Sequence, residues 1–178
     1  MDGKVYERFG SRTGFARYLG YWLLALSGKY EKFTLDPPER SRRIVFICSG
    51  NICRSPLAEE YARKLGRETA SCGFHCVEGY PADPRAKAFA ESQGLSLDNH
   101  KTKNINHFEF RVSDFVVVME PHHIGLFRQK FGENYALALA GNYCDRPNPY
   151  IHDPFNCCEE FFMRCEQRVV EAVRGICG

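Results

Sequence analysis

Residues 44–56 constrain the fold of this chain more than any other stretch. Their sequence is Ile-Val-Phe-Ile-Cys-Ser-Gly-Asn-Ile-Cys-Arg-Ser-Pro. The first four are apolar and mostly β-favouring, which predicts a buried strand, and Gly50 and Asn51 then predict a tight loop. Ser55 as a cap and Pro56 in the first turn predict that a helix begins at once. The stretch therefore predicts a strand, a short loop and a helix in direct succession.

A loop that closes on a helix N-terminus suits an anion, because its backbone N–H groups converge and the helix dipole adds positive potential. This loop begins with the thiol of Cys48 and ends with the guanidinium of Arg54. Arg54 can donate two parallel hydrogen bonds to a phosphate, and the same field favours the thiolate form of Cys48, which can attack phosphorus without a separate base. The other loop residues are expected to bind the phosphate: Ser49, Gly50, Asn51, Ile52, Cys53 and Ser55.

Strands and helices alternate along the rest of the chain. Apolar runs predict strands at 69–74, 114–119 and 135–140, and the helical period predicts helices at 57–65, 84–93, 121–130 and 157–176. This alternation predicts an α/β fold, a single three-layer domain whose four-stranded parallel sheet has helices on both faces and the phosphate loop after its first strand. Ligands of such sheets bind at the carboxyl ends of the strands, where this loop lies.

Composition limits the expected location, partners and cofactors of the protein. The chain has 178 residues, nine cysteines and a net charge of +2. No secretory signal opens the sequence and an odd number of cysteines cannot all pair, so we expect reduced thiols and a cytoplasmic location. No Lys or Arg run predicts a nucleic-acid partner. We expect no metal or other cofactor, since no pair of Cys-x-x-Cys motifs is present and His122 and His123 adjoin on an expected surface helix.

Residues 1–40 are expected to form a helical extension and a linker, and residues 41–178 the main domain. Aromatic and aliphatic residues recur within 12–33 at steps of three and four, among basic residues; they are Phe15, Tyr18, Leu19, Trp22, Leu23, Leu26, Tyr30 and Phe33. Residues 1–43 carry nine Lys or Arg against five Asp or Glu. The apolar run is too short to span a bilayer. The helix packs on its own domain, on a second copy in a homodimer, or on a membrane surface or partner, and the sequence leaves these alternatives open.

The loop from Cys48 to Pro56, in which five residues separate the cysteine from the arginine and a serine follows, resembles the phosphate loop of the low-molecular-weight protein tyrosine phosphatases. Farther on, Ile-His-Asp-Pro-Phe at 151–155 is similar to the Asp-Pro loop of that family. The resemblance implies hydrolysis of phosphotyrosine proteins through a phosphocysteine intermediate. Asp153 is then the acid that protonates the leaving phenolate and the base that later activates water, while Phe155 forms an apolar wall.

The resemblance also implies supporting roles. Asn51 would hold the loop in a strained form, with the left-handed backbone that Asn tolerates, and Ser55 would hydrogen-bond the nucleophilic sulfur. Ser71 and His100 match a serine and a histidine tied to that asparagine. Cys53 matches a cysteine that forms a disulfide with the nucleophile under oxidation, and a plain buried thiol is the alternative.

Three other functions fit parts of the pattern. An arsenate reductase needs two relay cysteines, and the pairs available lie outside the segment expected for them; these are Cys72 with Cys76 and Cys157 with Cys158. An arginine phosphatase typically has a small threonine where Ile52 stands. A phosphotyrosine- or phosphoinositide-binding module recruited by the N-terminal helix would not need both Cys48 and Asp153.

One departure from the family pattern concerns substrate selection. Between Ser71 and Ala82 the chain is one residue shorter than typical members, so the aromatic residue that lines the phenol slot has no clear counterpart. Phe74, His75 and Tyr80 are the candidates.

Overall fold

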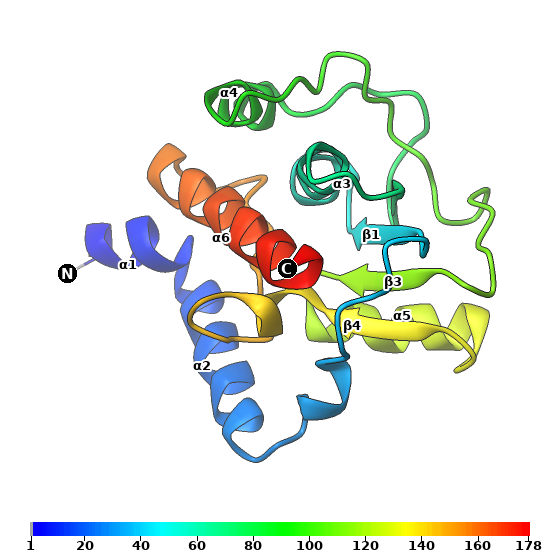
Figure 1. Cartoon of the computed structure of the whole chain (residues 1–178). Helices are drawn as coiled ribbons and strands as arrows, with labels where there is room; N and C mark the ends of the chain where they lie inside the picture. Colours follow the sequence, from blue (N-terminus) through cyan, green and yellow to red (C-terminus); the bar gives the residue numbers. More distant parts are fainter. Residues whose placement is uncertain (1) are drawn as a thin grey trace.

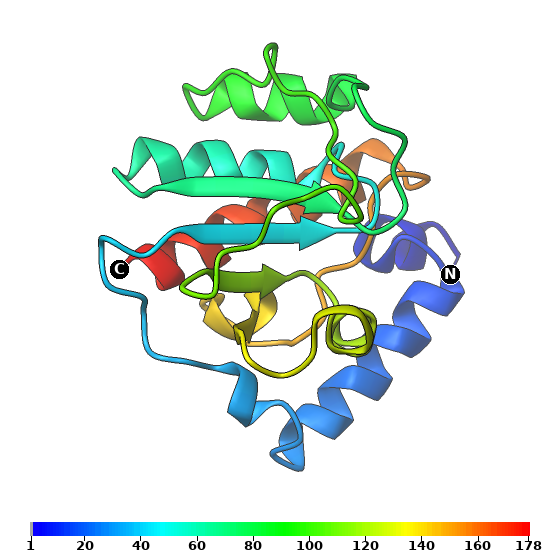
Figure 2. The same ribbon diagram turned by 90° about the vertical axis from the view of Figure 1, so that its right-hand side faces the viewer.

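The computed structural model describes residues 2–178. Four parallel strands form one sheet, as predicted, and the structure gives their order as β2-β1-β3-β4. They are β1 Ile44–Cys48, β2 Thr69–Gly73, β3 Phe115–Val118 and β4 Ala136–Leu139. The central strand β1 pairs with both neighbours, and its Ile44 lies opposite Thr69 and Phe115. Figure 2 shows the strands pointing toward one edge of the molecule, where the loop after β1 lies.

Helices cover both faces of this sheet (Figure 1). In the main domain they are α3 Arg54–Lys64, α4 Pro84–Ser92, α5 Pro121–Phe131 and α6 Glu159–Cys177. A 3₁₀ helix, η2 Ala140–Tyr143, follows β4. The predicted elements are confirmed, with ends that differ by one to three residues. The largest difference is at α3, which begins at Arg54 because Cys53, and not Ser55, occupies the cap position.

The alternation of side chains along β1 builds two hydrophobic cores. Ile44 and Phe46 are fully buried against residues of α3, α4 and α6, whereas Val45 and Ile47 are fully buried against residues of α5 on the other face. Successive residues of a strand point to opposite faces, so a strand covered on both sides needs an unbroken apolar run. This explains why four apolar residues precede the loop.

The N-terminal segment contains α1 Asp2–Phe9, α2 Arg12–Leu26 and the 3₁₀ helix η1 Glu31–Phe33. The predicted apolar stripe is divided, because Gly28, with φ of 77°, lies between α2 and η1. Tyr30 and Phe33 join the core on the α5 side, and Tyr21 packs its ring 5.2 Å from that of Tyr150. The outward residues of the stripe stay exposed; they are Phe15, Leu19, Trp22, Leu23 and Leu26.

Among residues 2–178, no helix is long and apolar enough to cross a membrane.

Candidate active site

The loop between β1 and α3 holds the Cys48 sulfur at its base. Cys48 is 2% exposed, its Sγ lies 3.0 Å from Ser55 Oγ, and it accepts the Asn51 N–H at 3.2 Å. Ser55 therefore contacts the Cys48 sulfur, as the sequence resemblance implied, and this use of its hydroxyl explains why it does not cap α3.

Asn51 organises the loop from within. It is the one non-glycine residue among those described with a positive φ, 51°, which confirms the predicted left-handed backbone. Its Nδ2 donates to Ser55 Oγ at 2.9 Å and to Ser71 Oγ at 2.8 Å, and its carbonyl accepts from His100 Nε2 at 2.7 Å. Its Oδ1 accepts the Lys103 N–H at 2.8 Å. Strand β2 and the 100–103 segment thus fix the loop shape, as expected for Ser71 and His100.

The Arg54 guanidinium lies buried beneath the loop. Nη1 donates to Glu120 Oε1 at 2.7 Å and to the Ile151 carbonyl at 2.9 Å. Nη2 lies 2.9 Å from Asp153 Oδ2 in an ion pair that lacks hydrogen-bond geometry, so its N–H groups stay able to donate. Burial acts to lower the pKa of Arg54, but Asp153 and Glu120 raise it above its ordinary value. The guanidinium is therefore a permanent cation between two carboxylates.

Asp153 reaches the same guanidinium from the loop before α6. Its Oδ1 accepts the Phe155 N–H at 3.3 Å, and its side chain is 40% exposed. Arg85 braces this loop by donating to the Phe155 carbonyl at 2.6 Å and the Cys157 carbonyl at 3.0 Å, while it pairs with Asp83 at 3.1 Å. The loop is thereby tied to the start of α4.

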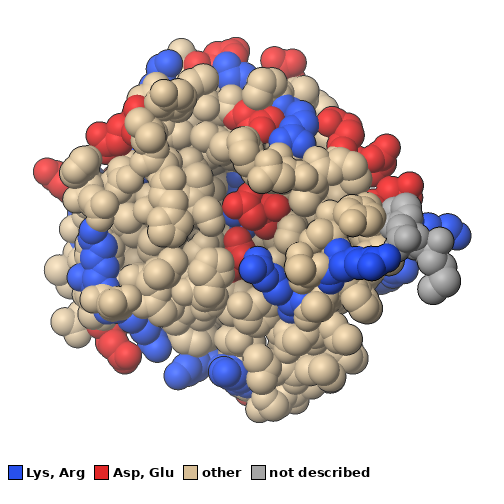
Figure 3. Space-filling model, turned by 180° about the vertical axis from the view of Figure 1, so that it is seen from behind, with Lys and Arg blue, Asp and Glu red and all other residues tan. Residues whose placement is uncertain are grey.

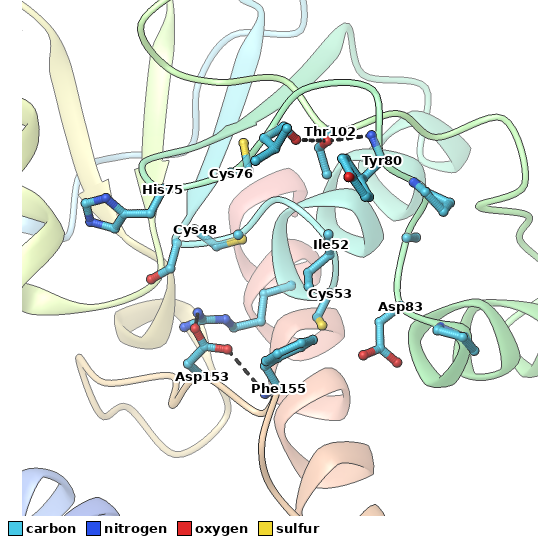
Figure 4. Close-up of a pocket in the computed structure, with 17 residues that line it drawn as sticks. Cys48, Ile52, Cys53, His75, Cys76, Tyr80, Asp83, Thr102, Asp153 and Phe155 are labelled. Carbon is cyan, nitrogen blue, oxygen red and sulfur yellow. Dashed lines mark hydrogen bonds and ion pairs between the residues drawn. The ribbon is translucent and has the colours of Figure 1, made fainter.

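A pocket of about 570 Å³ opens above the loop (Figure 4). Asp153 and Phe155 lie on one side of the loop, and Cys76 and Tyr80 on the other. Five of the predicted binding residues line the pocket: Ser49, Gly50, Ile52, Cys53 and Phe155. Asn51 and Ser55 are fully buried and do not line it, so they shape the loop from beneath. Cys53 is 3% exposed and burial raises its pKa well above the ordinary value, which keeps it a neutral thiol.

The structure separates the three candidates for the aromatic wall. Phe74 is 9% exposed and stacks on His123, with ring centroids 4.9 Å apart, so it belongs to the core. His75 and Tyr80 both line the pocket. Tyr80 is 60% exposed, and its backbone N–H donates to Thr102 Oγ1 at 2.9 Å. Tyr80 is the aryl group placed to face Phe155 across the opening.

The sequence resemblance implies an aryl phosphate as substrate. Replacing Tyr80 by alanine is then expected to raise KM for it by about three- to tenfold, because contacts between aromatic rings contribute about 0.5–1.5 kcal/mol. kcat should change by less than about twofold, since this contact is made equally in the ground state and the transition state. Steady-state kinetics on an aryl phosphate measure both constants. Val77→Ala is the matched control, because Val77 lines the same pocket with an aliphatic side chain. An unchanged KM in Tyr80→Ala would exclude Tyr80 as the wall.

The two adjacent histidines differ from the sequence expectation. His122 is half exposed, but His123 is fully buried at the start of α5 and its Nε2 lies 3.2 Å from Ser49 Oγ. Burial lowers the pKa of His123 to about 2, so the ring is neutral. With Glu120 they form a cluster of potential metal ligands within 4.8 Å. Since Glu120 already pairs with Arg54, a cation there would compete with a buried guanidinium.

Comparison with known proteins shows the family of the chain. The family model described as low molecular weight phosphotyrosine protein phosphatase matches residues 43–177. The chain belongs to the low-molecular-weight protein tyrosine phosphatase family. A family member from Streptomyces coelicolor is 31% identical over 156 residues, covering 74% of this chain and 93% of that protein. Wzb, a low molecular weight protein-tyrosine-phosphatase of Salmonella typhi, is 37% identical over 141 residues, covering 75% and 95%.

Solved structures agree with the family fold. The tyrosine phosphatase AmsI of Erwinia amylovora superposes with a TM-score of 0.69 at 28% identity, covering 76% of this chain and 90% of that chain. The arginine phosphatase YwlE of Geobacillus stearothermophilus superposes at 0.67 with 23% identity, covering 76% and 90%, which shows a shared fold. Residues 1–42 precede the family match.

Several residues around this phosphatase site gave no sequence signal. Glu120 follows β3 and pairs with Arg54. Its place at the carboxyl end of a predicted strand was the only feature of the sequence that pointed to the site. Glu166 on α6 is fully buried with no hydrogen-bond partner among the described residues, and burial raises its pKa to about 8. Gly73 ends β2 where an added Cβ would lie 2.9 Å from the Asn51 nitrogen, so the loop packs against a strand that has no side chain at that point.

Proposed function

We propose that this protein hydrolyses phosphotyrosine in protein substrates, with Cys48 as nucleophile, Arg54 as phosphate clamp and Asp153 as general acid and base. The observation that carries the proposal is the Arg54 guanidinium, which lies beneath the Cys48 loop and 2.9 Å from the Asp153 carboxylate. A cation, a sulfur nucleophile and a proton carrier therefore meet in one pocket with apolar walls. Family membership supports the same activity.

In the first step the phosphate binds the loop amides and Arg54, and the Cys48 thiolate attacks phosphorus. The S–P bond forms as the bond from phosphorus to the phenol oxygen breaks, and Asp153 gives its proton to that oxygen. A phosphate bound to the loop competes with Asp153 for Arg54.

In the second step water attacks the phosphocysteine. The Asp153 carboxylate takes a proton from that water, the S–P bond breaks, and inorganic phosphate leaves. Ser55 Oγ, 3.0 Å from the sulfur, can donate a hydrogen bond to the departing thiolate. The enzyme returns to its starting state without a cofactor.

Replacing Asp153 by alanine is expected to slow hydrolysis of substrates with poor leaving groups by about 10²–10³-fold, because a general acid contributes about 10²–10⁴ in rate. A nitrophenolate leaves without a proton, so the rate of hydrolysis of a nitrophenyl phosphate should fall much less. The measurement is the dependence of kcat/KM on leaving-group basicity, with Asp98→Ala as control, since Asp98 is an exposed aspartate that pairs with Lys87 and does not line the pocket. Equal losses for good and poor leaving groups would remove the acid role.

The substrate class of the enzyme can be tested by a direct assay. Phosphotyrosine, phosphoserine and phosphoarginine peptides compared on one preparation, with arsenate reduction run in parallel, test the proposal against its alternatives. The Ile52 side chain in the pocket floor and the aryl walls support a flat aromatic ester. Preferred turnover of phosphoarginine, or reduction of arsenate, would contradict the phosphotyrosine assignment.

We also propose that residues 41–178 form the catalytic domain and residues 1–40 an extension of it, in a protein that acts in the cytoplasm. The extension is held by buried Tyr30 and Phe33 and by Tyr143, whose hydroxyl donates to the Leu35 carbonyl at 2.7 Å. For residues 12–33, the alternatives to packing on their own domain alone are contact with a membrane surface and contact with a second copy in a homodimer.

A further inference from the structure

The outward side of α2 is an exposed apolar surface. Its residues, which we call the α2 outer face, are Phe15, Leu19, Trp22, Leu23 and Leu26, and their exposed fractions run from 39% to 67%. Spacings of four, seven, eight and eleven residues place them on one side of the helix. The other side packs on the domain through Gly14, Tyr18, Tyr21 and Ala25. Exposed apolar side chains gathered on one helix face mark an interaction surface.

Charge along α2 itself has one sign. Arg12 and Lys29 lie at the two ends of the helix, and no Asp or Glu occurs between Ser11 and Tyr30, beyond which Glu31 and Lys32 follow. Arg17 lies on the opposite side of the helix, where it contacts Tyr150. Trp, Phe and Leu on one face of a helix with basic residues beside them are typical of helices that lie in the plane of a membrane interface. A second copy docked face to face would bring like charges together, whereas anionic lipid would neutralise them.

The catalytic pocket opens on the same side of the molecule. Figure 2 shows α2 on the side toward which the strands point, and Figure 3, which views that side, shows a hollow near the centre and uncharged surface over α2 below and to the right of it. The Tyr21 ring packs on Tyr150, three residues before Asp153. The helix therefore lies close to the segment that carries Asp153, on the side of the molecule where the pocket opens.

We propose that the α2 outer face docks on anionic lipid bilayers and holds the catalytic pocket toward the membrane surface. With 15 residues, α2 lies on the bilayer rather than across it. The apolar side chains enter the interface and the flanking cations contact lipid phosphates.

Trp22 is the only tryptophan in the chain and lies on this face, so its fluorescence reports docking directly. The full chain is mixed with vesicles of phosphatidylcholine, with or without phosphatidylglycerol. We expect a shift of Trp22 emission to shorter wavelength and co-sedimentation that is more than about tenfold stronger with phosphatidylglycerol, because each basic residue near an anionic surface contributes about fivefold. High salt should reverse the preference.

The variant Leu23→Glu/Leu26→Glu should lose at least about tenfold in vesicle binding. Its matched control is Leu65→Glu/Val112→Glu, which places the same charges at two exposed apolar positions of the main domain and should bind as the wild type does. Both variants should keep wild-type hydrolysis of a soluble aryl phosphate. Equal binding by both variants, no binding to either vesicle, or a Trp22 shift that needs only a higher protein concentration and accompanies dimer formation would overturn the proposal.

Docking also restricts the substrate, and this consequence rests on the proposed phosphatase activity. A phosphotyrosine peptide anchored to anionic vesicles through a lipid should be hydrolysed at least about tenfold faster than the same peptide without its anchor. In Leu23→Glu/Leu26→Glu this ratio should fall toward one. The Trp22 measurement needs no catalysis, so a protein that binds vesicles but has no activity would refute the phosphatase proposal and leave the docking proposal standing. Equal rates on both peptides by a protein that does bind would refute the substrate restriction.

Discussion

Replacing Cys48 by serine is expected to abolish turnover, with a loss of at least about 10⁴-fold in kcat, because a serine hydroxyl at this position has no base to deprotonate it and is a far weaker nucleophile than a thiolate. The loop amides and Arg54 stay in place, so the variant should still bind phosphotyrosine peptides. Steady-state hydrolysis of an aryl phosphate measures the loss, and retention of a phosphotyrosine peptide on the variant measures the binding.

Cys53→Ser is the matched control for this experiment, because Cys53 lies in the same loop and is also buried. It should keep most of the activity, since its neutral thiol has no part in the phosphoryl transfer. Rapid quenching of the wild-type enzyme should also trap phosphate on Cys48. Hydrolysis that persists in Cys48→Ser, or labelled phosphate on another residue, would refute the mechanism.

Replacing Arg54 by lysine is expected to lower kcat/KM by about 10³-fold, within the range of about 10³–10⁵ known for arginines that stabilise transferring phosphoryl groups. An ammonium cannot give two parallel hydrogen bonds to the phosphate. The positive charge beside Glu120 is kept, so the variant should fold. By contrast, Arg54→Ala leaves the buried Glu120 without its guanidinium partner and should lose about 3–5 kcal/mol of stability as well.

Kinetics and urea unfolding of the two Arg54 variants separate these effects. Arg63→Lys is the control, since Arg63 lies on the same helix with its side chain 48% exposed. Its ion pairs at the surface contribute little, so neither activity nor stability should change measurably. A loss below about tenfold for Arg54→Lys would show that the guanidinium does not clamp the phosphate.

The strand, loop and helix at residues 44–64 were predictable because their signals are local. The apolar run predicts a strand buried on both faces, and Gly50 and Asn51 mark the turn. The left-handed backbone of Asn51 was expected from the family resemblance and is present, with φ of 51°. Contacts of Asn51 with Ser71 and His100 were also expected, on the resemblance alone.

Other features of the site had no local signal. The residue type of Ser55 predicted that it caps α3. Its hydroxyl instead contacts Cys48 Sγ and accepts from Asn51 Nδ2, so it does not cap the helix. His123 was expected on the surface and is buried, because α5 turns that side toward the Cys48 loop and Phe74.

The sequence by itself determined the parallel α/β sheet, the position of the phosphate loop and the identity of its thiol and guanidinium, because each depends on residues adjacent in the chain. The tertiary structure decided that Glu120 holds Arg54, that Tyr80 and not Phe74 faces the pocket, and which side of α2 is exposed. These features depend on contacts between segments far apart in the sequence. A pattern of residue types does not specify which of two apolar faces packs against another segment.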